Sequence, residues 1–390
     1  MDPIAFASEE FFVSEDIASA RSLPARAFTD PAFLNFELAT LFSRSWLMIP
    51  ESSALDGAPA LADALKIRGG RAAFSLLGKP LFLQRDWKSR LHCFPNVCTH
   101  AWYPLVEGRS RSKTIVCGQH GRSFDCAGKF QSQAGFGKGE LPGFPGAEDH
   151  LRDLPVGQWE QFLFACLGEP AESLAGLLKP LRASTAKLPL RDFKRAARSD
   201  EAREVEGNWK QHACNYMDKY HITFIHRAPR GLADAVDLAS YKTELYGRSA
   251  LQWAYARDPQ HGFDPKHLPA RFRDPRAPQR RVFALWWFLF PNLTLNFYPW
   301  GLSVNIYQPV NDAPERTRFL WHHYVWDKKK YARRSELWLD QQVDDEDVHA
   351  MALVRPGAAS GFAPRGRFSP REEAGPHWFH RQVHQAAFAA

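Results

Sequence analysis

The sequence predicts an α+β protein with a small antiparallel β domain and a larger domain in which helices cover an antiparallel sheet. From Trp46 to about Cys166, short β-rich runs such as PLFLQRD and KTIVCGQ are separated by Gly, Pro, Asn and Asp. Four further strand-like runs lie between residues 282 and 326, and two helical segments follow at about 328–354 and 370–388. A chain of 390 residues is long enough for two such domains.

The amino-terminal segment predicts a helix, because Asp30 can cap the run PAFLNFELATLF, whose apolar residues recur at helical spacing. We therefore expect residues 1–45 to form a helical segment that packs on the larger domain. Residues 46–168 should form the β domain, and residues 185–390 the larger domain. Within the larger domain, the Pro- and Arg-rich stretch at 257–281 predicts a long surface loop.

The composition is that of a packed globular protein, with 45% hydrophobic and 24% charged residues. The net charge of +7 would allow an anionic partner. However, the Lys and Arg residues are scattered among 43 acidic ones, and the sequence contains no basic helix or aromatic RNA-binding signature. We therefore expect no nucleic-acid partner.

Three features bear on the location of the protein. The chain begins with MDPIAFASEE, which is acidic and lacks the basic start and apolar run of a signal peptide. The longest apolar run, VFALWWFLF at 282–290, is too short to span a bilayer and predicts a buried strand. Six cysteines in 390 residues favour a reducing compartment, in which cysteine serves as a metal ligand or a core residue. We therefore expect a cytoplasmic protein with no membrane partner.

The segment CTHAWYPLVEGRSRSKTIVCGQH at 98–120 contains two Cys–His pairs, spaced C-x-H and C-x-x-H. A structural zinc site usually takes its ligands as Cys pairs and His pairs, whereas here each loop offers one residue of each kind. Such a mixed set suits a [2Fe–2S] cluster in which two thiolates hold one iron and two imidazoles hold the other. The sequence therefore predicts Cys98, His100, Cys117 and His120 as cluster ligands, with a zinc site as the alternative.

These motifs resemble those of the Rieske proteins, and in particular the low-potential class that is linked to oxygenases. The respiratory class carries an additional disulfide between its two loops, but Trp102, Tyr103 and Gln119 occupy the corresponding positions here and contain no sulfur. Cys93 and Cys126, just outside the loops, are expected to be buried small hydrophobic residues. One difference is that Ala-Trp follows the first His, where the oxygenase-linked class often has Arg-Gly.

A second constellation, NYMDKYHITFIH at 215–226, contains the pattern D-x-x-H-x-x-x-x-H. A mononuclear non-haem iron site takes two histidines and one carboxylate on one face and leaves the other coordination positions for O2 and substrate. His221 and His226 are five residues apart, so a regular helix would point them in different directions. For both to bind one metal, the helix would have to end or bend between them.

The carboxylate ligand is expected in the helical run DQQVDDEDVHAMALV at 340–354. On a helix, Asp347 would lie in the middle of the apolar stripe, where an unpaired charge is costly and a metal ion would remove that cost. Asp344 would lie nearer the edge of the stripe and is kept as the alternative. Asp345 and Glu346 would point to the polar side.

The segment from 208 to 226 resembles the iron-binding run of the Rieske-type ring-hydroxylating oxygenases, in which N-W-K, N-x-x-D, Y-H and a second His recur. The resemblance covers nearly the whole chain and implies a helix-grip-like catalytic domain. It also implies that His221, His226 and Asp347 bind Fe(II), a choice that agrees with the position of Asp347 in the apolar stripe. Asn215 and Tyr220 would orient these ligands.

The same resemblance implies a bridging role for Asp218. In this family the corresponding Asp is hydrogen-bonded between an iron-ligating His and a cluster-ligating His of the neighbouring subunit. Here Asp218 would link His221 to the partner subunit's His120. Such a head-to-tail arrangement must close into a ring, which we expect to be a homotrimer.

Around residues 226–252 and at the carboxyl-terminal end, the chain looks most like the choline monooxygenase group and its bacterial quaternary-ammonium relatives. These enzymes act on N-methylated cations. The aromatic run at 285–288, Leu-Trp-Trp-Phe, could hold such a cation through cation–π contacts, or it could belong to the core.

We therefore interpret the chain as the terminal oxygenase of a Rieske non-haem iron system that hydroxylates or demethylates a small organic substrate with O2. A separate NAD(P)H-dependent reductase or a ferredoxin would supply the electrons. Arg109, Arg111 and Lys113, between the two ligand pairs of the cluster, could receive an acidic electron donor. The alternatives are an aromatic-ring or aromatic-acid hydroxylase on the same scaffold, and a pure electron carrier, which would have no use for a second iron site.

Overall fold

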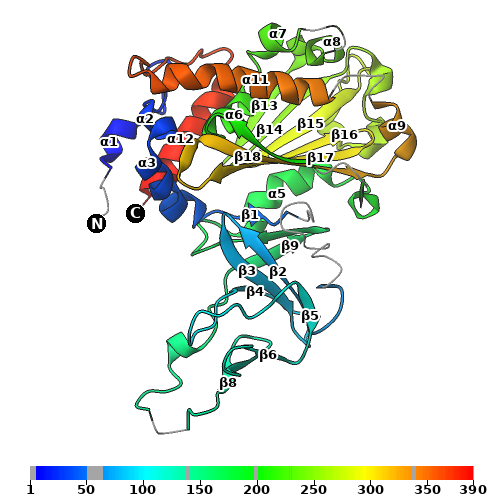
Figure 1. The fold of residues 1–390 in the computed structure, drawn as a ribbon. Coiled ribbons are helices and arrows are strands. Elements are labelled where there is room, and N and C mark those ends of the chain that lie inside the picture. Colours follow the sequence, from blue (N-terminus) through cyan, green and yellow to red (C-terminus); the bar gives the residue numbers. More distant parts are fainter. Residues whose placement is uncertain are drawn as a thin grey trace. The chain divides into compact units, whose positions relative to one another are not determined.

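The computed structural model describes residues 6–50, 65–137, 141–196, 201–227, 229, 231–334 and 340–389. The chain forms two compact units, which Figure 1 shows as ribbons. The smaller unit comprises Ser43–Ala171, and the larger unit comprises Met1–Phe42 together with Glu172–Ala390. The smaller unit is therefore set into the chain of the larger one.

The smaller unit consists of three small sheets in which all neighbouring strands are antiparallel. Their strand orders are β4-β3-β2-β5, β1-β10-β9 and β6-β7-β8. The strands are β1 (Leu47–Met48), β2 (Gly70–Leu76), β3 (Lys79–Arg85), β4 (Leu91–Pro95), β5 (Arg109–Arg111), β6 (Thr114–Val116), β7 (Ser123–Asp125), β8 (Phe130–Ser132), β9 (Val156–Trp159) and β10 (Phe162–Ala165). The prediction of a small antiparallel β domain is confirmed.

The larger unit is built on one antiparallel sheet of eight strands in the order β11-β18-β17-β16-β15-β14-β13, with β12 also pairing with β18. Its strands are β11 (Lys194–Arg195), β12 (Glu201–Glu206), β13 (Lys242–Tyr246), β14 (Ser249–Tyr255), β15 (Val282–Leu289), β16 (Leu293–Tyr298), β17 (Gly301–Val310) and β18 (Ala313–Val325). The prediction of helices on an antiparallel sheet is confirmed as well.

Helices cover both faces of this sheet (Figure 1). As a result, β15 is buried along its whole length. The ring of Trp287 points to α5 (Leu174–Thr185), and its Nε1 donates to Oγ of Ser184 at 3.0 Å. Phe288 points to the opposite face and packs on Phe379 of α12 (Ala374–Phe388). On that face, α6 (Trp209–Met217) lies beside α12 and beside α11 (Asp340–Ala359).

The amino-terminal helices α1 (Ser8–Phe11), α2 (Arg26–Thr29) and α3 (Pro31–Glu37) belong to the larger unit. As predicted, Asp30 caps α3: its Oδ1 accepts from the backbone N–H of Ala32 at 2.8 Å. At the other end of α3, Glu37 forms an ion pair of 2.8 Å with Nζ of Lys210, the second residue of α6. Both side chains are fully buried, so this pair ties α3 to α6 within the larger unit.

Three details of the prediction need correction. The stretch at 257–281 is not a plain surface loop, because it contains three 3-10 turns and buries Phe263, Leu268 and Phe272. Asp258 and Asp264 cap the first two turns, each of which begins with Pro, and Pro presets the backbone for a helical turn. The turns are η5 (Pro259–His261), η6 (Pro265–His267) and η7 (Ala270–Phe272).

The helix expected at 328–354 is instead α9 (Lys328–Ala332) and α11, with residues 335–339 outside the described part of the chain. Helix α11 continues beyond residue 354 to Ala359 and contains Pro356. The last helix begins at Ala374 rather than near 370. Among the described residues, no helix is long and apolar enough to cross a membrane.

Candidate metal centres

The end of α6 places the first two candidate ligands. Asn208 begins the helix, because its side chain accepts from the N–H of Lys210 at 2.9 Å while the side chain of Gln211 accepts from the N–H of Asn208. The helix stops at Met217, and Asp218 adopts an extended backbone. His221 then precedes α7 (Ile222–Ile225), a helix of a single turn. The helix was expected to end or bend between the two histidines; instead, α6 ends before both of them, and the single turn of α7 lies between them.

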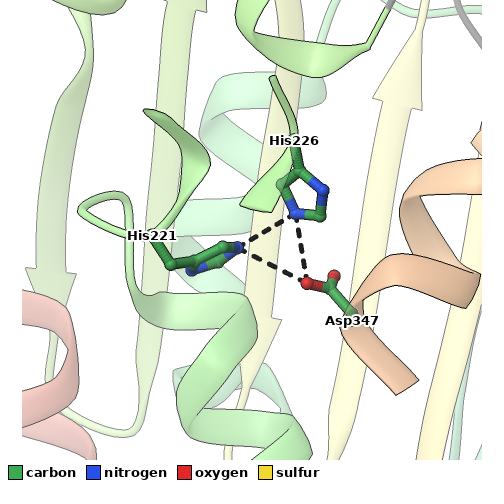
Figure 2. Close-up of side chains that lie close together, drawn as sticks. All are labelled: His221, His226 and Asp347. Carbon is green, nitrogen blue, oxygen red and sulfur yellow. Dashed lines mark hydrogen bonds and ion pairs between the residues drawn. The ribbon is translucent and has the colours of Figure 1, made fainter. Parts of the chain in front are cut away.

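The structure brings His221, His226 and Asp347 together (Figure 2). Nε2 of His221 lies 3.0 Å from Nε2 of His226. Oδ1 of Asp347, on α11, lies 3.1 Å from Nε2 of His226 and 3.5 Å from Nε2 of His221. One ligand atom from each of the three residues lies within 4.8 Å of the others. Two imidazole nitrogens and one carboxylate oxygen at this spacing are the donors that a single Fe(II) ion needs. Asp344, the alternative carboxylate, does not belong to this group of three.

Two further side chains hold these candidate ligands in place. Asn215 donates from Nδ2 to Oδ1 of Asp347 at 2.7 Å, which agrees with an orienting role. Glu346 accepts from Nδ1 of His226 at 2.7 Å and is itself held by Nε2 of Gln342 at 2.8 Å. The sequence analysis placed Glu346 on the polar side of the helix and missed this contact.

The charges of the three side chains suit a cation. Burial raises the pKa of Asp347, but its contacts with His221 and His226 outweigh burial and lower that pKa well below its usual range. Burial lowers the pKa of His221, but the carboxylates of Asp218 and Asp347 outweigh it and raise the pKa to about 9. Burial also lowers the pKa of His226, but the carboxylates of Asp347 and Glu346 outweigh it and raise the pKa. A divalent cation that binds both imidazoles through Nε2 would displace any proton from those atoms.

Asp218 and Tyr220 have different surroundings. Oδ2 of Asp218 lies 3.5 Å from Nδ1 of His221, the nitrogen on the far side of the ring from Asp347. Oδ1 of Asp218 accepts from the backbone N–H of Tyr220 at 2.7 Å. Tyr220 is 49% exposed, and its ring contacts Phe224. Its expected role in orienting the ligands stays a prediction.

The three candidate ligands line a cavity of about 80 Å³, which we call the iron cavity. Its walls are largely aromatic and amide side chains: Tyr216, Tyr241, Trp286, Tyr298, Tyr307, Gln252, Asn296 and Asn305. The aromatic run of β15 is thus divided between two roles. Trp286 lines the iron cavity, whereas Trp287 belongs to the packing against α5.

The smaller unit brings together the four candidate cluster ligands in two loops with the same hydrogen bonds. In each loop the Cys donates its N–H to the carbonyl five residues on, at 2.9 Å for Cys98 and 2.8 Å for Cys117. In each loop the carbonyl of the Cys accepts from the residue four positions on, which is Trp102 in one loop and Gly121 in the other. Both of these residues have left-handed backbones, with φ of 60° and 68°. Trp102 carries a side chain at this position and is 83% exposed.

The side chains of the four residues fit a cluster with two thiolate and two imidazole ligands. The ring centroids of His100 and His120 are 4.8 Å apart. Burial raises the pKa of the Cys98 thiol, and its hydrogen bond with the Cys117 thiol raises it further, while backbone N–H groups at His100 and Ala101 oppose both effects. Two buried thiols in contact favour a site in which metal ions take the place of their protons.

Asp149 joins the two loops and was not found from the sequence. Its backbone carbonyl accepts from Oγ1 of Thr99, in the first loop, at 3.0 Å. Its carboxylate accepts from Nη2 of Arg122, in the second loop, at 2.5 Å. Arg122 is almost fully buried, so this ion pair is shielded from water. No motif relates these residues, because Asp149 lies 27 positions from Arg122.

Other residues singled out in the sequence lie outside the two centres. Cys93 and Cys126 are buried, as predicted, and burial raises the pKa of Cys93 to about 12, which makes its thiol unreactive. Arg109, Arg111 and Lys113 are exposed, and Arg111 and Lys113 lie over the ring of Trp87 at 5.4 and 5.8 Å.

Two protein families match the chain. The Ring hydroxylating alpha subunit (catalytic domain) family matches residues 192–387, and the Rieske [2Fe-2S] domain family matches residues 59–145. The chloroplastic choline monooxygenase of Amaranthus tricolor is 26% identical over 377 residues, which cover 93% of this chain and 77% of that protein. The carnitine monooxygenase oxygenase subunit of Escherichia coli (strain K12) is 24% identical over 371 residues, covering 92% and 91%.

Solved structures show the same fold. A quaternary ammonium Rieske monooxygenase superposes with a TM-score of 0.72 at 20% identity, over 98% of this chain and 99% of that one. Naphthalene 1,2-dioxygenase from Rhodococcus sp. superposes with a TM-score of 0.70 at 16% identity, over 94% of each chain. The fold is therefore shared by proteins that differ in what they act on.

Proposed function

Because the chain belongs to the ring hydroxylating alpha subunit family and carries a Rieske domain, we propose that it is the terminal oxygenase of a Rieske non-haem iron system. It would hydroxylate or demethylate a small organic substrate, using O2 and electrons from a separate NAD(P)H-dependent reductase or ferredoxin. The convergence of His221, His226 and Asp347 beside an aromatic cavity carries this proposal. A pure electron carrier would have no use for such a site.

Each group of residues has a defined task in this proposal. Cys98, His100, Cys117 and His120 would hold the [2Fe–2S] cluster, and His221, His226 and Asp347 would hold one Fe(II) ion with coordination positions left open. When bound, these centres supply electrons and the site at which O2 and substrate react. Glu346 and Asn215 keep the ligand atoms pointing at one place through hydrogen bonds of 2.7 Å.

We propose that Asp218 conducts electrons between subunits. Its carboxylate lies 3.5 Å from Nδ1 of His221, so it faces the side of the ring that a metal on Nε2 would leave free. The other oxygen of Asp218 is held by the N–H of Tyr220. Asp218 would contact the partner subunit's His120, and the subunits would close into a ring of three.

The free cysteines and the need for reduced metal centres favour the cytoplasm as the location.

We propose a quaternary ammonium compound as the substrate, because relatives that cover more than 90% of the chain are choline and carnitine monooxygenases. The aromatic walls of the iron cavity suit an N-methylated cation. An aromatic acid is the second candidate, since naphthalene 1,2-dioxygenase has the same fold.

A single-turnover experiment tests the proposal without the electron donor. The purified protein, loaded with both metal centres and reduced, is mixed with O2 and with choline, carnitine or benzoate in turn. Cluster reoxidation is followed by absorbance and the product by mass spectrometry. Fast reoxidation and product with a quaternary ammonium compound support the proposal, and product from benzoate alone would move the enzyme to the aromatic-acid branch. Reoxidation that no substrate accelerates, with no product, would contradict oxygenase activity towards these classes.

A further inference from the structure

Arg122 and Asp149 form a buried ion pair next to the candidate cluster ligands without being ligands themselves. Nη2 of Arg122 lies 2.5 Å from Oδ1 of Asp149 and 3.4 Å from its backbone carbonyl oxygen. Arg122 is only 2% exposed. Water and salt screen such buried charges much less than surface charges, so their electrostatic effect on neighbouring groups is larger.

Single hydrogen bonds join the pair to both ligand loops. The backbone carbonyl of Arg122 accepts from the N–H of Cys117 at 2.8 Å, and Arg122 follows His120 by two positions. The backbone carbonyl of Asp149 accepts from Oγ1 of Thr99 at 3.0 Å, and Thr99 stands between the two candidate ligands of the first loop. The two charges are therefore fixed relative to all four candidate ligands.

Three phenylalanine rings contact the guanidinium of Arg122. Its Cζ lies 4.9 Å from the ring centroid of Phe130, 5.8 Å from that of Phe144 and 6.0 Å from that of Phe124. Aromatic rings at these distances attract a cation and keep water away from it. The positive charge of Arg122 therefore lies in a largely apolar shell.

Packed rings also connect this shell to a candidate imidazole ligand. Phe144 packs on Phe136 with centroids 5.3 Å apart, and Phe136 packs edge-on against His100 with centroids 5.6 Å apart. The path from the guanidinium to His100 thus runs through aromatic side chains, which transmit an electric field with less screening than water does.

Asp149 is the counter-charge of Arg122. Among the residues that the structure describes, it is the only carboxylate that forms an ion pair with Arg122. Its other oxygen, Oδ2, accepts from the N–H of Gly146 at 2.8 Å, which fixes the carboxylate in place. Loss of the Asp149 charge would therefore leave a buried and uncompensated guanidinium beside the cluster loops.

We propose that this ion pair sets the reduction potential of the [2Fe–2S] cluster. Reduction adds one electron, so a nearby positive charge favours the reduced state and a nearby negative charge disfavours it. A unit charge at about 10 Å, with an effective dielectric constant of about 20, changes such an equilibrium by more than tenfold. Arg122 therefore raises the potential and Asp149 lowers it. The inference rests on the proposed cluster ligands, but not on the substrate or on the mononuclear iron.

The test is a redox titration at pH 8 of the protein with its cluster and of variants that remove one charge at a time. Asp149→Asn keeps the backbone contact with Thr99 and should raise the midpoint potential, whereas Arg122→Met should lower it. We expect each shift to be at least about tenfold in the reduction equilibrium, which is about 59 mV for one electron. Arg122→Met/Asp149→Leu removes both charges and should return the potential towards that of the wild type.

Two control variants separate charge from shape. Arg122→Lys keeps the positive charge and should shift the potential less than half as far as Arg122→Met. Arg152→Gln removes a positive charge from an exposed side chain three positions after Asp149, and it should leave the potential unchanged because water screens that charge. A purely structural role of the pair would not give shifts of opposite sign. Equal potentials in the wild type and both single variants, or two shifts of the same sign, would overturn the inference.

Loss of the cluster from a variant is also informative. If Arg122→Met contains no cluster, Asp149→Asn and the double variant decide, because the shift in the first must be absent from the second. If these two also contain none, the pair is needed to assemble the cluster and the inference is wrong. Wild-type protein without the visible spectrum of a [2Fe–2S] cluster would instead refute the cluster ligands and the proposed function, whereas unchanged potentials would refute the inference alone.

Discussion

Glu346 accepts a hydrogen bond from Nδ1 of His226 at 2.7 Å, on the side of the ring opposite to the contact of Nε2 with Asp347. A carboxylate in this place fixes the imidazole tautomer with its proton on Nδ1, which leaves the Nε2 lone pair for a metal. Glu346 therefore acts on the metal through His226.

Glu346→Gln should bind Fe(II) about 10–100-fold more weakly, because an amide supports the required tautomer less well than a carboxylate. The measurement is a chelator-competition titration of protein that carries the cluster but lacks mononuclear iron. The neighbouring Asp345→Asn is the matched control, since Asp345 is exposed and pairs with Arg203 at 2.9 Å. Equal iron affinity in Glu346→Gln and wild type would disprove the role given to Glu346.

Asp347→Asn should lose the mononuclear iron and keep the visible spectrum of the cluster. The substitution preserves the shape and the acceptor for Asn215, so the loss would follow from the missing charge. Asp344→Asn should retain the iron, because Asp344 lines the cavity without joining the three ligand atoms. Iron per chain, measured by elemental analysis, distinguishes the two carboxylates, and full iron in Asp347→Asn would show that the assignment is wrong.

Asp218→Asn should retain both metal centres and slow substrate-dependent reoxidation of the cluster by about 10–100-fold. Stopped-flow absorbance of the reduced enzyme with O2 and substrate measures this rate. Lys219→Gln is the control, since Lys219 is the next residue and pairs with Glu372 at 2.9 Å. A normal rate in Asp218→Asn would exclude the proposed path through this carboxylate.

Removing only one charge of the buried pair of Glu37 and Lys210 should lower the free energy of unfolding. Lys210→Met leaves the Glu37 carboxylate buried without a counter-charge, so we expect a loss of about 3–5 kcal/mol in the free energy of unfolding. Glu37→Gln/Lys210→Met removes both charges and should recover most of that loss. Urea midpoints followed by tryptophan fluorescence test both variants. If the double variant is no more stable than Lys210→Met, the charge is not the cause.

His380 should make the larger unit sensitive to acid. Its Nδ1 accepts from the N–H of Leu23 at 3.0 Å, and burial, followed by the positive charge of Lys210, lowers its pKa to about 3. The unfolded chain has a His pKa near 6.5, so it binds the proton first as the pH falls. The free energy of unfolding therefore decreases as the pH falls below 6.5, and the loss is about 2 kcal/mol at pH 5.

His380→Gln keeps an acceptor for Leu23 but cannot take up this proton. Between pH 7.5 and pH 5 the variant should lose about 2 kcal/mol less stability than wild type. The exposed His349 offers a control, because His349→Gln should follow the wild-type pH dependence. The measurement is the urea midpoint at each pH, and identical pH profiles for His380→Gln and wild type would contradict the prediction.

Patterns of residue type and spacing, together with the family resemblance, predicted the fold and indicated residues that the structure brings together. Asp30 indicated a helix start because capping is a local interaction, and Asp347 stood out as a charge in an apolar stripe. The mixed Cys–His pairs indicated the cluster because few other sites use them. The separate roles of Trp286 and Trp287 did not emerge, since β15 is buried on both faces and periodicity cannot tell which element lies on which side.

Contacts between distant residues could not be predicted from one sequence. A helical wheel shows where Glu346 leaves the backbone but not how far its side chain reaches back to His226. Asp149 gave no signal at all, because its two contacts join it to residues 50 and 27 positions away in the chain.

The insertion of the smaller unit between Phe42 and Glu172 has a consequence for biosynthesis. Helix α3 leaves the ribosome early, but Glu37 cannot form its ion pair until Lys210, which is 173 positions later, has been synthesised. At about 5–20 residues per second this delay is on the order of ten seconds or more. The smaller unit is contiguous, so its whole sequence is synthesised within that interval. A nascent chain that stalls before α6 would therefore contain the complete sequence of the smaller unit and the Glu37 of α3 without Lys210.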